Sequence, residues 1–233
     1  MIMDKHILRI ESLIKQTGLE NESGSIIYSG NSTLKKGDYY FLGQNPGGNA
    51  QRYEKDTILK QLLHSGEFNE YLEGYWNGGR HQSNILAMFN DLEVDIKNTF
   101  STNLSFIRSV NTTAYSRNLK DDYELFWPIH EYCLSVIKPK TIICNGADAR
   151  NFFMKQMKIF PSTYEESFLK RLYRGNRMKC IAAKGTLMVN GEELNIRLLS
   201  TFHLSKWPYE DYQENILWLR SRIRQDEELG WKL

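Results

Sequence analysis

Four short segments of the chain place amide, hydroxyl or imidazole side chains directly after apolar stretches. They are GQNPGG at 43–48, TNLSF at 102–106, CNGA at 144–147 and FHLSKW at 202–207. Amides and an imidazole suit the edge of a flat heterocycle, which offers carbonyl oxygens and ring nitrogens. The segments hold no cluster of the carboxylates that hard cations such as Mg²⁺ require. They therefore indicate recognition of a base-like ring rather than metal-dependent phosphoryl transfer.

Motifs typical of several other enzyme classes are missing from the sequence. It contains no GxxxxGK[ST] phosphate loop and no GxGxxG, GxSxG or HExxH motif. Its three cysteines are widely spaced and form no CxxC pair, which argues against a disulfide framework, a structural zinc site and a four-cysteine iron–sulfur cluster. We therefore expect a protein with no metal site and no cofactor.

Strand and helix patterns alternate along the chain and define how these segments are positioned. Apolar runs rich in β-branched or aromatic residues predict strands at 39–44, 99–106, 141–144 and 196–202. Apolar residues at helical spacing predict helices at 1–16, 53–63, 124–137, 147–157 and 209–223. This alternation predicts a three-layer α/β/α fold around a central four-stranded, mainly parallel sheet.

Two further segments predict local structure: a hairpin turn and an irregular insert. Asn190-Gly191 predicts the turn of a hairpin between 181–189 and 194–199. The segment 65–83 mixes glycines with aromatic residues and predicts a long irregular insert. Such an insert is either a functional loop or a surface loop pinned by its aromatic side chains.

Length and composition fit one ordinary globular domain covering residues 1–233, with 41% hydrophobic and 25% charged residues. Thirty basic and 28 acidic residues give a net charge of +2, which neither establishes nor forbids nucleic-acid binding. No run approaches the roughly 18 apolar residues of a membrane-spanning helix, and the N-terminus lacks the apolar core of a signal peptide. We expect a cytoplasmic protein without a membrane partner.

The order and spacing of the four segments resemble the uracil-DNA glycosylase superfamily across residues 39–216. The first segment resembles the GxNPG form of the mismatch-specific and single-strand-selective branches more than the GQDPYH of the main branch. The last segment departs from the family, which usually has His-Pro-Ser where this chain has His203-Leu204-Ser205. The resemblance implies a glycosylase-like fold and an enzyme that removes a base after flipping it out of the DNA stack.

The resemblance also implies roles for particular residues. Asn45 would position the attacking water, although an amide cannot accept its proton as the aspartate of the main branch can. His203 would donate a hydrogen bond to O2 of the departing base. Asn103 would read the base edge, with Gln44 and Gly47 beside it in the base pocket. The alternatives are a turn residue before a proline for Asn45, a structural histidine for His203 and a strand-end cap for Asn103.

Gly47 occupies a position that resembles a tyrosine of the main branch, which presses against C5 of the base. Glycine leaves room there, so we expect the pocket to accept pyrimidines that carry a substituent at C5. The alternative is that Gly47 and Gly48 merely permit a turn with positive φ. The aromatic ring that stacks on the base is left open among Tyr53, Tyr75, Trp76 and Phe106.

Three residues of the last segment match the family's DNA-binding loop. Ser205 would grip a phosphate, Lys206 would add charge, and Trp207 would fill the gap left by the flipped base. Trp207 beside Pro208 also fits a hydrophobic staple for the helix that follows.

Together these features predict a monomeric, monofunctional DNA glycosylase acting on single- or double-stranded DNA that contains a uracil-like or C5-modified pyrimidine. The setting would be base-excision repair or defence against phages with modified DNA. The alternatives are a non-catalytic DNA- or nucleotide-binding module on the same fold and a hydrolase of free nucleosides or nucleotides.

Overall fold

The computed structural model describes residues 4–64, 66–74, 79–111, 114–115, 117–173 and 175–228. Its helices, in chain order, are α1 (Lys5–Thr17), α2 (Ile58–His64), α3 (Glu70–Glu73), α4 (Arg80–Leu92), α5 (Leu119–Ile137), α6 (Ala147–Gln156) and α7 (Glu210–Glu228). Its strands are β1 (Tyr39–Gly43), β2 (Phe100–Asn103), β3 (Thr141–Asn145), β4 (Met157–Ile159), β5 (Glu165–Tyr173), β6 (Asn176–Val189) and β7 (Glu192–Thr201). Within these residues no helix is both long enough and apolar enough to cross a bilayer.

The strands form one mixed sheet in the order β2-β1-β3-β7-β6-β4, with β5 paired to β6. The pairs β1–β2, β1–β3 and β3–β7 are parallel, so the four predicted strands and their parallel arrangement are confirmed. The predicted size of the sheet was wrong: it has seven strands rather than four, because β6 extends it antiparallel to β7 and pairs with β4 and β5. The predicted hairpin is confirmed, and its turn residues Asn190 and Gly191 have φ of 49° and 81°.

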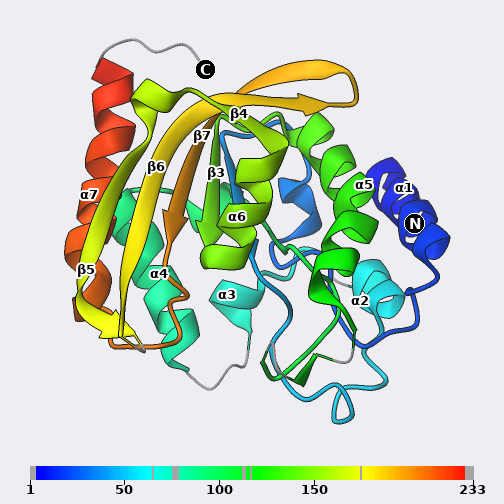
Figure 1. The fold of residues 1–233 in the computed structure, drawn as a ribbon. Helices are drawn as coiled ribbons and strands as arrows, with labels where there is room; N and C mark the ends of the chain where they lie inside the picture. The colour runs from blue at the N-terminus through cyan, green and yellow to red at the C-terminus, as the bar shows by residue number, and fades with distance from the viewer. Residues whose placement is uncertain are drawn as a thin grey trace.

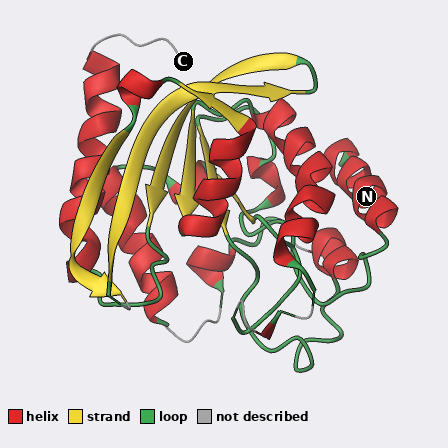
Figure 2. Cartoon of the chain, viewed as in Figure 1, coloured by secondary structure: helices red, strands yellow, loops and turns green. Residues whose placement is uncertain are grey.

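Helices cover both faces of the sheet, as Figures 1 and 2 show. One face packs with α1, α5 and α6 in a core that includes Ile142, Phe153 and Leu198. The other face packs with α4 and α7 in a second core that includes Phe41, Phe89 and Leu199. The two faces separate by residue alternation along each strand. The mixed α/β architecture with helices on both sides of the sheet is therefore confirmed.

Two predictions of local structure need correction. The helix predicted at 53–63 begins only at Ile58, because residues 51–55 form turns. The insert at 65–83 is partly helical, since it contains α3 and the first turn of α4. Asn69 caps α3, its side-chain oxygen accepting hydrogen bonds from the amides of Tyr71 and Leu72. The candidate stacking residues Tyr75 and Trp76 lie outside the described residues.

A buried histidine of α5 ties the core to the parallel strands. His130 is 1% exposed; its Nδ1 lies 2.9 Å from the hydroxyl of Tyr40 and its Nε2 lies 3.1 Å from the carbonyl oxygen of Leu104. Nε2 must donate to that carbonyl, so Nδ1 accepts from Tyr40. Burial lowers the pKa of His130 to about 4, and the ring is neutral in the folded protein near pH 7.

We predict that His130 makes the fold acid-sensitive. Between pH 6.5 and about pH 4, the imidazole of His130 is protonated in the unfolded chain but stays neutral in the folded protein. The free energy of unfolding should therefore fall as the pH falls through this window, with a contribution from His130 of up to about 1.4 kcal/mol per pH unit. Urea unfolding between pH 7.5 and 4.5 measures it. His130→Gln should flatten the slope, whereas replacing the exposed His64 by glutamine should not. Equal slopes in wild type and His130→Gln would contradict the prediction.

Candidate functional site

The carboxyl ends of the four parallel strands lie at one edge of the sheet. Gly43 at the end of β1 pairs with Asn103 at the end of β2, and Asn145 at the end of β3 pairs with Thr201 at the end of β7. The segments that the sequence singled out follow these ends directly. The structure therefore brings the loops that carry Asn45, Asn103 and His203 to the same edge, where open α/β sheets bind ligands.

Asn45 is half-buried and held by its amide nitrogen. Nδ2 donates to the carbonyl oxygens of Pro46 at 2.9 Å and Ser109 at 3.4 Å. Ser109 follows β2, so this contact links the loops after β1 and β2. Among the described residues the side-chain oxygen of Asn45 receives no hydrogen bond. An amide fixed in this way can still accept a hydrogen bond from a water molecule.

Asn103 is 5% exposed and lies against the backbone of β1. A Cβ atom at Gly43 would overlap Oδ1 of Asn103, so only glycine leaves room for this amide. The Asn103 amide also hydrogen-bonds the hydroxyl of Tyr28, whose pKa is raised chiefly by burial. The amide is thus oriented by two neighbours that belong to other parts of the chain.

Gln44 faces the helices on one side of the sheet. Its Nε2 donates to the carboxylate of Asp148, in the first turn of α6, and lies 3.4 Å from the hydroxyl of Tyr123 on α5. These contacts fix the side chain independently of any ligand. A role for Gln44 in contacting a base stays a prediction.

His203 lies half-buried just beyond β7 and stacks on a second histidine that the sequence did not indicate. The rings of His81 and His203 are 4.9 Å apart between centroids and 22° from parallel. Burial lowers the pKa of His203 to about 4, with a smaller contribution from the positive charge of Lys206. Burial lowers the pKa of His81 to about 3, and His203 adds to this effect. Both rings are therefore neutral near pH 7.

Asn145 holds this pair in place and is itself 1% exposed. Its Oδ1 accepts from the amide of Leu204 at 3.1 Å, so its Nδ2 faces Nε2 of His81 at 3.0 Å. Nε2 of His81 must accept this hydrogen bond, which places the proton of that ring on Nδ1. Nδ1 of His203 lies 2.8 Å from Oγ of Ser205. When Ser205 donates in that contact, Nε2 of His203 carries the proton and is a donor.

His81 and Asn145 are the residues that the sequence reasoning missed. Asn145 belongs to the third segment, CNGA at 144–147, but the sequence analysis gave it no role. Its position at the end of a predicted strand could have indicated a site residue. His81 lies in the first turn of α4, inside the segment read as an irregular insert. Nothing in the sequence pattern links it to His203.

Gly47 is exposed, and a Cβ atom built on it would meet no atom within 4 Å. Positive φ occurs at Gly48, with a value of +104°, and not at Gly47. A turn with positive φ therefore accounts for the glycine at position 48. It does not account for the glycine at position 47, where a side chain would meet no other atom. Nη1 of Arg108 donates to the carbonyl oxygen of Gly47 at 2.6 Å, and its guanidinium lies 4.8 Å from the ring centroid of Tyr53.

Phe106, a second candidate for stacking on a base, lies in the core. It is 0% exposed and its ring centroid is 4.6 Å from that of Phe126. Tyr53, the other candidate within the described residues, is exposed, and its ring lies beside Gly48.

The loop of Ser205, Lys206 and Trp207 is anchored at its last residue. The amide of Trp207 donates to the hydroxyl of Tyr212 on α7 at 3.0 Å, and its carbonyl oxygen accepts from Asn84 on α4 at 2.9 Å. The rings of Trp207 and Tyr212 are 6.0 Å apart. This half-buried packing against Tyr212 agrees with the alternative that Trp207 is a hydrophobic staple for α7. Insertion of Trp207 into DNA stays a prediction. Lys206 is exposed.

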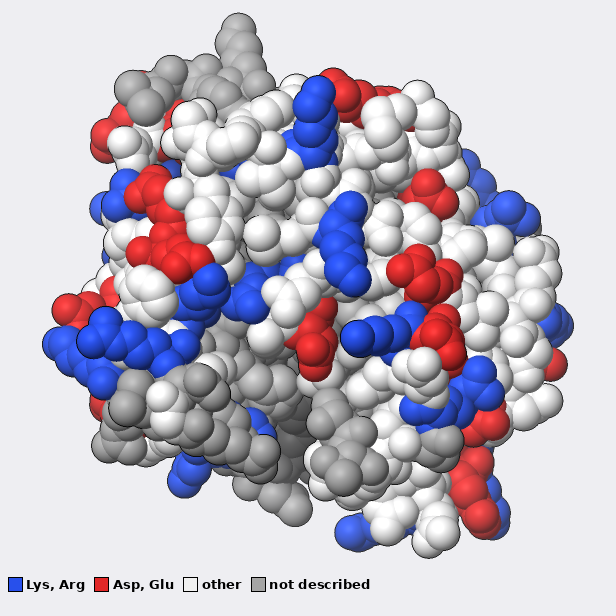
Figure 3. Space-filling view, viewed as in Figure 1, with Lys and Arg blue, Asp and Glu red and all other residues white. Residues whose placement is uncertain are grey.

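No group of three or more His, Cys, Asp or Glu side chains that could hold a metal ion occurs in the described part of the chain. On the face shown in Figure 3, basic and acidic side chains are interspersed. The side chains of Asn45, Asn145 and His203 at this edge offer hydrogen bonds from amides and from an imidazole that is neutral near pH 7.

We predict that the ring of His203 titrates near pH 4 in the folded protein, because burial disfavours its charged form. NMR titration of the imidazole signals measures this directly. Replacing Lys206 by glutamine removes a neighbouring positive charge and should raise the midpoint slightly. A midpoint near 6.5 in the wild type would contradict the burial of this ring.

Comparisons with known proteins assign no family to the chain. No protein-family model matches it, and no curated protein matches its sequence. The resemblance to uracil-DNA glycosylases therefore rests on the residues of the four sequence segments.

Proposed function

We propose that the protein is a DNA glycosylase that hydrolyses the N-glycosidic bond of a uracil-like or C5-modified pyrimidine. The observation that carries the proposal is that Asn45, Asn103 and a neutral His203 lie at or just beyond the carboxyl ends of β1, β2 and β7, at one edge of the parallel strands. Ligands of open α/β sheets bind at this edge. The three side chains offer the hydrogen bonds that a pyrimidine edge and a water molecule need.

His203 supports the departure of the base. When the glycosidic bond breaks, the base takes the electron pair and negative charge collects on its O2. A neutral imidazole with a proton on Nε2 donates a hydrogen bond to that oxygen without bringing a full charge into the site. A donor that is already oriented can lower the barrier by about 3 kcal/mol. The contacts of His203 with His81 and Ser205 provide this orientation.

Asn45 acts on the water that attacks the sugar. Its amide nitrogen is tied to Pro46 and Ser109, so its oxygen is left to accept a hydrogen bond from the water. An amide does not remove the proton; after the water adds to a sugar that already has oxocarbenium character, the proton passes to the departed base anion or to solvent. We therefore expect slow hydrolysis that depends on a good leaving group.

The open space at Gly47 sets the substrate class in this proposal. No side chain there presses against C5 of the base, so uracil, thymine and pyrimidines with larger C5 groups are all candidates. A cellular role in base-excision repair or in defence against phages with modified DNA follows from which of these is removed. The enzyme would act as a monomer in the cytoplasm.

We predict that both candidate catalytic side chains are required. Duplex and single-stranded DNA carrying uracil, thymine or 5-hydroxymethylcytosine, with and without glucose, should acquire alkali-sensitive sites. His203→Ala should slow the reaction by about 100-fold, the size of effect seen when an oriented donor is removed. Asn45→Ala should also slow it. Asn45→Asp should not exceed the wild type, because its carboxylate would face the carbonyl oxygens of Pro46 and Ser109.

The exposed His64→Ala serves as the matched control for these variants and should leave the rate unchanged. Tight DNA binding without abasic product on any substrate would favour the non-catalytic module. Turnover of a free nucleoside without DNA would favour the nucleoside hydrolase.

We predict that Gly47→Tyr narrows specificity. The added ring fills space that is empty in this structure, so C5-substituted bases should lose at least about tenfold in rate relative to uracil. Gly47→Ala, whose Cβ meets nothing, is the control and should keep the wild-type preference. Unchanged relative rates in Gly47→Tyr would contradict a base pocket beside residue 47.

A further inference from the structure

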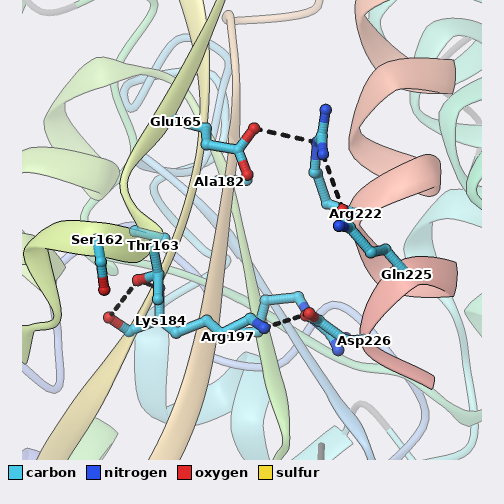
Figure 4. Close-up of a pocket in the computed structure, with 10 residues that line it drawn as sticks. Ser162, Thr163, Glu165, Ala182, Lys184, Arg197, Arg222, Gln225 and Asp226 are labelled. Atoms are coloured by element: carbon cyan, nitrogen blue, oxygen red, sulfur yellow. Dashed lines mark hydrogen bonds and ion pairs between the residues drawn. The ribbon is translucent and has the colours of Figure 1, made fainter. Parts of the chain in front are cut away.

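A cavity of about 140 Å³ lies between α7 and the antiparallel part of the sheet (Figure 4). Its walls come from β5, β6, β7, α7 and the 3₁₀ turn Pro161–Thr163. Arg197 of β7 lines it and pairs with Thr141 at the start of β3, four residues before Thr201 at the carboxyl end. The cavity is therefore about 13 Å along β7 from the edge that carries His203, and it is a separate site.

One wall of the cavity contains an ion-pair network of Arg197, Lys184 and Asp226. The carboxylate of Asp226, 5% exposed, accepts from Nε of Arg197 at 2.7 Å and, on its other oxygen, from the ammonium of Lys184. Arg197 is also 5% exposed. A buried guanidinium and a half-buried ammonium thus share the carboxylate of Asp226.

Several polar groups that line the cavity and make no hydrogen bond to the described residues are hydrogen-bond donors. Nε of Arg222 is buried without a hydrogen bond; Oε2 of Glu165 lies 3.4 Å away, outside hydrogen-bond geometry. Nη2 of Arg197 makes no hydrogen bond to the described residues, since Arg197 uses Nε and Nη1. Oε1 of Gln225 accepts from Arg222, which leaves the amide NH₂ of Gln225 and the hydroxyl of Ser162 to bind a ligand. Figure 4 shows these side chains around one space.

We propose that this cavity binds a small phosphate-type oxyanion, either the free ion or the phosphate group of a small metabolite. Three cations and two carboxylates give the lining a net charge of +1. Guanidinium groups match the tetrahedral oxygens of phosphate with paired N–H donors. The volume is below the roughly 300–1,000 Å³ typical of pockets for drug-sized ligands. The site does not depend on the proposed glycosylase activity.

The test is a titration of the full chain with inorganic phosphate at constant ionic strength, with chloride as the balancing anion. Calorimetry gives the affinity, and the Nε–H signals of Arg222 and Arg197 in NMR spectra locate the site. We expect saturable binding that shifts both signals. Arg222→Gln should weaken binding at least about tenfold, because a charge-assisted hydrogen bond is lost. Arg224→Gln, two residues along α7 and outside the cavity, is the control and should bind as the wild type does.

A second variant separates an anion site from a purely structural network. Glu165→Gln removes the carboxylate that faces Arg222 and should tighten phosphate binding, whereas loss of a structural ion pair would not. Binding no stronger than that of chloride, or equal affinities in wild type, Arg222→Gln and Glu165→Gln, would overturn the proposal. Displacement of phosphate by a short oligonucleotide would assign the cavity to the DNA backbone and would also overturn it.

Discussion

The parallel pairing of β2, β1, β3 and β7 is the constraint on which the rest of the site depends. Because these strands run in one direction, their carboxyl ends and the polar segments that follow them share an edge. A shift of one strand by a single residue would turn its side chains to the opposite face. Gly43 fixes the spacing at this edge, since any side chain there would occupy the position of the Asn103 amide. The backbone register thus decides which groups meet.

Burial rather than charge sets the chemistry at this edge. Asn145 uses both ends of its amide, one on the loop that carries His203 and one on His81. Both rings are half-buried and stacked, and burial keeps their pKa values low. Neutral donors that are already oriented favour an anion that forms during the reaction over a neutral ground state. This is the property that a base-removing enzyme needs of the residue facing the leaving group.

The sequence predicts the parallel strands well because each is a short apolar run with an amide or imidazole side chain at or just beyond its end. It does not predict α4, whose buried face includes Gln82 and Asn84 as well as apolar residues. Gln82 donates to the carbonyl oxygen of Tyr71, and Asn84 donates to that of Leu204, so tertiary hydrogen bonds replace apolar contacts and obscure the helical pattern. The role of His81 was hidden for the same reason, since it depends on a strand end 64 residues away. The β6–β7 hairpin was predicted, but β5 was missed because it mixes charged and apolar residues.

The release of a free base from DNA is the direct test of the account. Wild-type protein is incubated with DNA that carries uracil or a C5-modified pyrimidine, and the freed base is identified by mass spectrometry together with the abasic strand. The account predicts that at least one such base is released in equal amount to abasic sites, and that His203→Ala, folded as judged by circular dichroism, releases far less. Intact glycosidic bonds on every substrate with the folded wild-type protein would contradict it.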